Sequence, residues 1–243
     1  MKKHVLILGL TLVSIGLILI TSSLTYAQEQ NEFVIPLTDP AKRGKLKAHL
    51  NKGSITVKGT ARKDVLVRYK SEADEDDDDR DHNKNDKPRD GLKRVGGGGM
   101  DLEASERDNY VRVQSNSWNN GMNLDIEIPS GFDLEVHTYN DGDLMITNIQ
   151  GELALTNYNG EITALNISGS VIATTYNGEI KVTFDKVTET PMSYSTYNGD
   201  IDITYPAATK ATFKMKTEQG EIYTGFDMNI TKSGPIQKKD EKS

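Results

Sequence analysis

Residues 156–182 read TNYNGEITALNISGSVIATTYNGEIKV, in which the five residues Tyr-Asn-Gly-Glu-Ile occur twice, starting at Tyr158 and at Tyr176. A related copy starts at Tyr139 as Tyr-Asn-Asp-Gly-Asp-Leu, and another starts at Tyr197 as Tyr-Asn-Gly-Asp-Ile. These strong copies recur every 18 to 21 residues. A repeat of fixed length is typical of a solenoid, in which each coil contacts its neighbours.

Glycines mark a finer period, because weaker copies such as Ile149-Gln150-Gly151 and Ile167-Ser168-Gly169 fall between the strong ones. The first four intervals between these glycines are nine residues each, and the last two are 21 residues. We expect the glycines to form corners, since the glycine of Asn-Gly readily adopts positive φ. The predicted corner glycines are Gly142, Gly151, Gly160, Gly169, Gly178, Gly199 and Gly220.

Apolar residues alternate with polar ones after each corner, as in Glu161-Ile162-Thr163-Ala164. Period two places the aliphatic side chains on one face of a strand. One coil has too few of them to form a core at about 1.5–3 kcal/mol each, whereas stacked coils cover one another. We therefore predict an all-β fold, a single-stranded β-solenoid with about 18–21 residues per coil. A sandwich of hairpins is the competing fold, but it does not predict a turn at every ninth residue.

Stacked coils place equivalent side chains about 4.8 Å apart. The tyrosines and asparagines of the strong copies should therefore form an aromatic column and an amide ladder. Two interpretations stay open: the columns only stabilise the corners, or the exposed row binds a glycan or peptide. The acids after the glycines should form a further, solvated column. The candidate binding residues are Tyr139, Tyr158, Tyr176 and Tyr197 with Asn140, Asn159, Asn177 and Asn198.

The N-terminal residues 1–27 have the layout of a secretory signal peptide: Lys2 and Lys3, an apolar run from Val5 to Ile20, and small residues at positions −3 and −1 of a cleavage site, Thr25 and Ala27. The run is also about long enough for an uncleaved membrane anchor. We expect cleavage near Ala27 and an exported protein, either periplasmic, at the cell surface or secreted. Membrane contact is expected only through this segment, if it stays uncleaved.

The other boundaries follow from composition. Residues 28–70 read as short strands of the β domain, and Asn51-Lys52-Gly53 looks like an early, degenerate corner. Residues 71–99 form an acidic, glycine-rich insertion, with ten acids and four bases between Ser71 and Asp90. Such a segment is expected to be disordered. Residues 100–226 are the predicted solenoid, and residues 227–243 are a polar tail.

The resemblance to a known family begins at Ile126-Glu127-Ile128-Pro129-Ser130-Gly131, continues through Leu134-Glu135-Val136-His137-Thr138 and extends over the Asn-Gly-Asp/Glu-Ile units. In these residues the sequence resembles the DUF4097 family of putative adhesins. The resemblance implies a bacterial, exported β-solenoid that is adhesin-like in architecture. The family offers no agreed catalytic residues to assign here.

No catalytic pattern stands out in the sequence. His49, His82 and His137 are isolated in sequence, and neither HExxH nor GxSxG occurs. We predict no catalytic residues, no cofactor and no metal site. An excess of 36 acids over 29 bases argues against nucleic acid as a partner. The leading hypothesis is a non-enzymatic adhesin-like protein that binds or scaffolds an envelope or surface glycan or protein. The alternatives are an envelope-stress or regulatory partner protein and a glycan-active enzyme on a β-helix.

Overall fold

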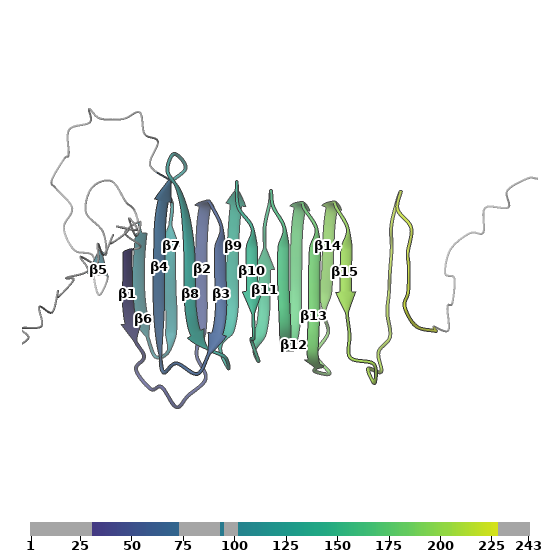
Figure 1. The fold of residues 1–243 in the computed structure, drawn as a ribbon, viewed down its shortest axis with the longest axis horizontal. Helices are drawn as coiled ribbons and strands as arrows, with labels where there is room; N and C mark the ends of the chain where they lie inside the picture. Colours follow the sequence, from purple (N-terminus) through teal and green to yellow (C-terminus); the bar gives the residue numbers. More distant parts are fainter. Residues whose placement is uncertain (1–30, 73–92, 95–101, 228–243) are drawn as a thin grey trace, which may run out of the picture. The chain divides into compact units, whose positions relative to one another are not determined.

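The computed structural model describes residues 31–72, 93–94 and 102–227. All secondary-structure elements assigned in these ranges are β-strands (Figure 1). The chain divides into two compact units at Tyr205 and Pro206, and the described part of the second unit, 206–227, contains no strand. The predicted signal peptide lies outside the described residues, as does the tail from residue 228. No helix in the described part is long and apolar enough to cross a membrane.

The strands of the first unit form two sheets. Sheet A contains, in spatial order, β1 (Asn31–Pro36), β4 (Asp64–Glu72), β8 (Gly121–Pro129), β3 (Ile55–Thr60), β10 (Leu144–Thr147), the first half of β12 (Ile162–Asn177), β13 (Ile180–Val187) and β15 (Ile201–Thr204). Sheet B contains β5 (Lys93–Arg94), β6 (Leu102–Arg107), β7 (Tyr110–Ser115), β2 (Lys45–Lys52), β9 (Asp133–Asn140), β11 (Glu152–Thr156), the second half of β12, and β14 (Ser193–Asn198). The two sheets are continuous through β12.

From β9 onward the chain alternates between the two sheets, and each coil adds one rung, a pair of strands with one in each sheet (Figure 1). In sheet A, Leu144 pairs with Ile162, Ile162 with Ile180, and Ile180 with Ile201, all in parallel. The coils are therefore 18, 18 and 21 residues long, in agreement with the predicted period. Hairpins would pair sequential strands antiparallel, so this part is not a hairpin sandwich.

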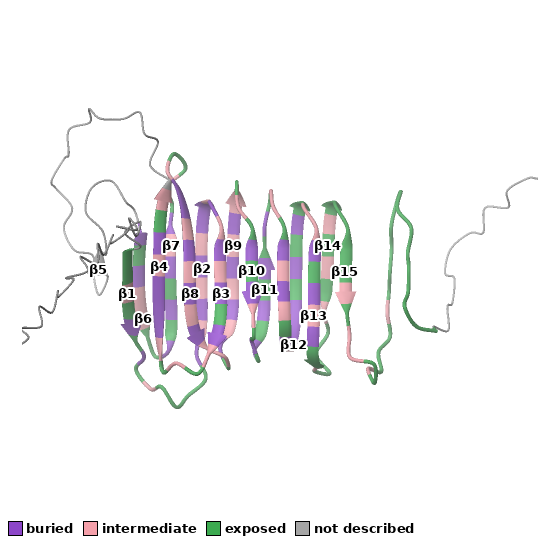
Figure 2. Cartoon of the chain, in the orientation of Figure 1, coloured by how far each residue is buried: buried purple, intermediate pink, exposed green. Residues whose placement is uncertain are grey.

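The core lies between the two sheets, where side chains from both form one hydrophobic cluster. Buried and exposed positions alternate along the strands, as Figure 2 shows for β13. Leu144, Ile162 and Ile180 are fully buried in one column. Each contributes about 1.5–3 kcal/mol of burial energy, so the stack gains stability with every rung.

The structure corrects the predicted place of the N-terminal strands. They were expected to precede the solenoid, but β2 and β3 form a rung inside it. β2 lies between β7 and β9 in sheet B, and β3 lies between β8 and β10 in sheet A. The reason is that Gly53 provides the same corner as the later repeats, with φ +112°. Parallel pairing depends on matching register and does not require neighbouring rungs to be adjacent in sequence.

Antiparallel strands cover one end of the stack. β4 pairs with β8 and β1, and β6 pairs with β7 and β5. Two pieces of the predicted disordered insertion are strand: Ser71–Glu72 end β4, and Lys93–Arg94 form β5. The rest of that insertion lies outside the described residues.

The solenoid prediction was too long at its C-terminal end. The last assigned strand ends at Thr204, and the copy around Gly220 has no assigned strand. An added Cβ at Gly220 would meet only the Thr217 side chain within 4 Å. This copy reads Glu218-Gln219 where the strong copies have Tyr-Asn, so it lacks the aromatic ring that stacks between coils and has the longer Gln amide in place of Asn.

Candidate functional site

The four repeat tyrosines form one continuous stack on sheet B. Ring centroids of Tyr139 and Tyr158 lie 4.7 Å apart, those of Tyr158 and Tyr176 5.0 Å, and those of Tyr176 and Tyr197 4.8 Å. Neighbouring rings are tilted by only 3–5°. Trp118, the single tryptophan of the chain, packs edge-on against Tyr139 at 5.3 Å. These five residues are called the aromatic column below.

The stacking determines what the aromatic column can offer a ligand. The facing surfaces of neighbouring rings cover one another, so the inner tyrosines expose their edges and hydroxyl groups. Tyr158 and Tyr176 are 38% and 41% exposed, whereas Tyr197 at the end is 72% exposed. The predicted row is therefore not an open aromatic platform for sugar faces. It is a row of phenol groups spaced by one strand separation.

The asparagines next to the tyrosines form an amide ladder. Each Nδ2 donates to the Oδ1 of the preceding coil: Asn159 to Asn140, Asn177 to Asn159, and Asn198 to Asn177, all at 2.8 Å. Because the two inner amides, Asn159 and Asn177, both donate and accept, the ladder locks the corners in register. This rigidity holds the aromatic column in place.

The corner glycines divide into two kinds. Gly160, Gly178 and Gly199 have φ values of +152°, +156° and +147°, as the Asn-Gly pattern predicted. Gly142, Gly151 and Gly169 do not follow an asparagine and do not have positive φ; at these corners Asp141, Asn148 and Asn166 adopt it.

Close approach explains why those three positions are still glycine. A Cβ at Gly169 would lie 2.0 Å from the carbonyl oxygen of Gly151, and one at Gly151 would lie 1.9 Å from that of Phe132. The coils touch through backbone there, so any side chain would separate them.

An inner polar column, which the sequence reading missed, supports the same corners. Thr175 donates its hydroxyl to the Gly160 carbonyl, and Thr196 donates to Gly178, each at 3.0 Å. Thr138 and Asn157 make the equivalent bonds to Gly53 and Gly142. The sequence does contain a periodic signal for this column, because each repeat tyrosine directly follows one of these threonine or asparagine residues.

The acids after the corner glycines do not all point only into solvent, because one of them hydrogen-bonds to a neighbouring coil. The Asp143 carboxylate accepts the backbone N–H of Glu161 at 2.8 Å, which links two neighbouring coils. Asp133, which does not directly follow a glycine, accepts the N–H of Glu152 in the same way at 2.7 Å.

The outer face of sheet B changes character along the stack. Around β2 and β9 it is charged: Glu135 pairs with Lys45 at 2.8 Å and with Lys47. Hydrogen bonds from Lys45 and then Lys47 lower the pKa of Glu135 to about 2. From β11 to β14, the two central rows of this face carry no charge; they consist of Ala154, Ile172 and Ser193, and of Thr156, Thr174 and Ser195.

The histidines are not all isolated, contrary to the sequence reading. His49 and His137 are register partners on β2 and β9, and their ring centroids lie 4.9 Å apart. Burial, and secondarily the His49 imidazole, lowers the pKa of His137 below its usual value. His82 lies outside the described residues. No group of three or more acidic, histidine or cysteine side chains within the described ranges is placed to hold a metal ion.

Comparisons with known proteins bear on the family. The model of the Toastrack DUF4097 family matches residues 16–243. Two solved structures are similar to the chain. A putative cell adhesion protein from Clostridium sporogenes has 11% identity and a TM-score of 0.44, with 72% of this chain and 99% of that chain covered. A putative adhesin from Bacteroides fragilis has 10% identity and a TM-score of 0.26, with 73% and 98% covered. No curated protein matches the chain. Since the family model matches nearly the whole length, the chain belongs to the Toastrack DUF4097 family.

Proposed function

We propose that this protein is an exported, non-enzymatic, adhesin-like module that binds an extended glycan or protein of the envelope or cell surface through the outer face of sheet B. The observation that carries the proposal is the aromatic column: four stacked tyrosines and Trp118, partly exposed, beside an uncharged strip of sheet. The N-terminal sequence pattern of residues 1–27 supports export.

The geometry favours binding over a purely structural role for the hydroxyl groups. Stacking alone needs aromatic rings, which phenylalanine would supply. Tyrosine adds a donor and acceptor on each rung, at the 4.7–5.0 Å spacing of the rings. That spacing is comparable with the length of one sugar ring in an extended glycan. Rings already fixed by their neighbours also lose little freedom when a ligand binds.

A binding experiment tests this proposal. The full chain, expressed with its own N-terminal segment and purified from the fraction that it reaches, is applied to a glycan array and used in envelope pull-downs. The triple variant Tyr158→Phe, Tyr176→Phe, Tyr197→Phe keeps the stack and removes the hydroxyls, and it should weaken binding at least about tenfold, as expected from several lost hydrogen bonds.

The matched control removes hydroxyls from the outer side of sheet A, in the double variant Thr163→Val, Thr183→Val, and should bind like wild type. Equal loss in both variants, unchanged binding in the triple variant, or turnover of a bound glycan would each refute the proposal. Capture of one envelope protein with neither glycan binding nor binding to the cell surface would favour the regulatory alternative.

A further inference from the structure

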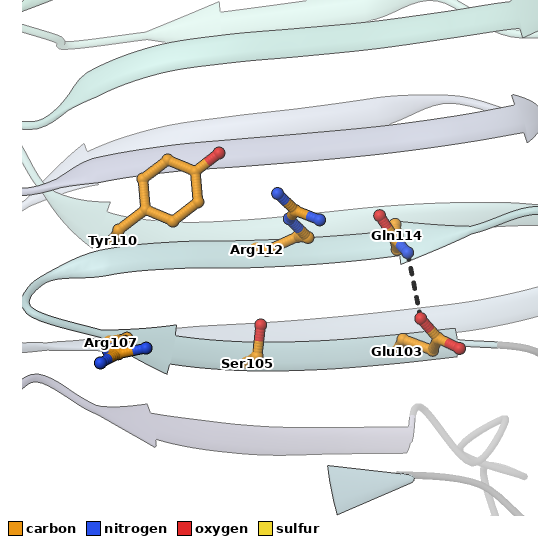
Figure 3. A pocket seen from close by; sticks show the side chains of 6 residues that line it. All are labelled: Glu103, Ser105, Arg107, Tyr110, Arg112 and Gln114. Atoms are coloured by element: carbon orange, nitrogen blue, oxygen red, sulfur yellow. Dashed lines mark hydrogen bonds between the residues drawn. The ribbon is translucent and has the colours of Figure 1, made fainter. Parts of the chain in front are cut away.

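The β6–β7 hairpin forms a shallow depression of about 200 Å³ on the outer side of sheet B (Figure 3). The hairpin turns tightly through Asp108 and Asn109, both with positive φ. Buried Asn109 fixes this turn by donating to the carbonyl groups of Asp39 and Lys42. The depression is therefore built on a well-anchored element. Its lining residues are Glu103, Ser105, Arg107, Tyr110, Arg112 and Gln114.

Arg112 is an available cation in this depression. Its guanidinium lies 5.9 Å from the centre of the Tyr110 ring, and it forms no ion pair or hydrogen bond with any of the described residues. The one acid of the lining, Glu103, accepts a hydrogen bond from Gln114 at 3.0 Å, drawn as a dashed line in Figure 3. At the hairpin end, the Arg107 Nε lies 3.9 Å from the Asp108 Oδ2. This is an ion pair between two almost fully exposed side chains.

The neighbouring lysines are not free in the same way. Lys45 and Lys47 lie beside Tyr110 and Arg112 in the register, but both pair with Glu135. The unpaired positive charge of the depression therefore belongs to Arg112. A guanidinium is planar and donates two parallel N–H bonds, which suits carboxylate and phosphate groups. The Ser105 hydroxyl, opposite Arg112 in the register, lines the same depression and adds a further donor.

We propose that this depression binds a carboxylate or phosphate group of an extended ligand, whose remaining part lies across sheet B toward the aromatic column. The inference rests on the proposed function and specifies the ligand as an acidic polymer. Arg112 supplies the anion contact, and the uncharged rows with the tyrosine hydroxyls accept the neutral part. The charged and uncharged ends of one face then give the ligand a fixed direction.

Titration with three probes of similar length tests this assignment: an oligogalacturonate for carboxylate, a poly(glycerol phosphate) for phosphate, and a neutral chito-oligosaccharide. Binding to the full chain is followed by calorimetry and by the fluorescence of Trp118. Arg112→Ala should lower the affinity for the anionic probe that binds at least about tenfold, as expected for a lost charge-assisted pair, and leave the neutral probe unchanged. Arg112→Lys should recover part of the loss.

The matched control is Lys181→Ala, which removes one exposed positive charge from the outer side of sheet A on β13, and it should change neither affinity. Equal affinity of wild type and Arg112→Ala for both anionic probes would overturn the anion site. If the triple tyrosine variant still lost binding in that case, the proposed function would stand. Failure of both anionic probes to bind the wild-type chain would overturn the acidic-polymer assignment, whereas the glycan array and the pull-downs decide the proposed function separately.

Discussion

Replacing Gly178 by alanine tests the corner geometry most directly. Gly178 has φ +156°, and a Cβ there would lie 2.0 Å from the carbonyl oxygen and 2.5 Å from the carbonyl carbon of Gly160. Both contacts are with backbone of the preceding coil, so no side chain can rotate away. The two coils must separate locally to make room.

The expected cost has two parts. Separation weakens the backbone bonds between these two coils, from Asn177 N–H to the Tyr158 carbonyl, 2.9 Å, and from Gly160 N–H to the Asn177 carbonyl, 2.8 Å. At about 1 kcal/mol each, this gives about 2 kcal/mol. Strain at positive φ adds about 1–3 kcal/mol. The total of about 3–5 kcal/mol corresponds to a fall in Tm of about 6–20 °C for a protein of this size.

Thermal unfolding followed by circular dichroism measures this change. Gly131→Ala is the control, because an added Cβ there meets nothing within 4 Å, and its Tm should match wild type. A Gly178→Ala variant that melts within about 2 °C of wild type, well below the expected shift, would show that the coils do not touch at the corner as described.

Three further substitutions probe the inner polar column, the amide ladder and the ion pairs of Glu135. Thr175→Val removes a buried hydroxyl that donates to a glycine carbonyl, so it should lower the free energy of unfolding by about 1–2 kcal/mol in urea titrations, whereas Thr174→Val on the outer face should not. Asn177→Asp places a carboxylate against the Asn159 Oδ1 that the amide donates to at 2.8 Å; it should cost about 1–2 kcal/mol at pH 7 and less once acid protonates the carboxyl. Glu135 has its pKa lowered from 4.5 to about 2, so its ionised form stabilises the fold above pH 4.5, and this stabilisation is lost as the pH falls toward 2. Because the pair is partly exposed, Glu135→Gln should cost less than about 1 kcal/mol at pH 7, and urea titrations at pH 2 should find no difference from wild type.

The repeat made the later coils predictable because it fixes corner, register and core together. Gly160 and Gly178 bound a coil of 18 residues, and Ile162 and Ile180 occupy one buried column, as their spacing required. The stacking of the tyrosines also follows from the spacing. The repeat period does not determine how the tyrosine rings are oriented. Only their orientation shows that the stacked rings cover each other's faces.

Other features depend on pairing between distant segments, which a local pattern cannot reveal. The contact between His49 and His137 requires β2 to lie next to β9, 88 residues apart in register. The depression around Arg112 likewise depends on the antiparallel hairpin that covers one end of the stack. Single residues such as Trp118 carry no periodic signal at all.

The position of the β2–β3 rung has a consequence for synthesis. A ribosome delivers this rung early, yet the strands on either side of it, β7 and β9 in one sheet and β8 and β10 in the other, are made only later. A nascent chain ending before Leu144 leaves β3 with an unpaired edge. Completion of the N-terminal half therefore waits for the C-terminal half, which keeps the emerging polypeptide open until most of it has been translated.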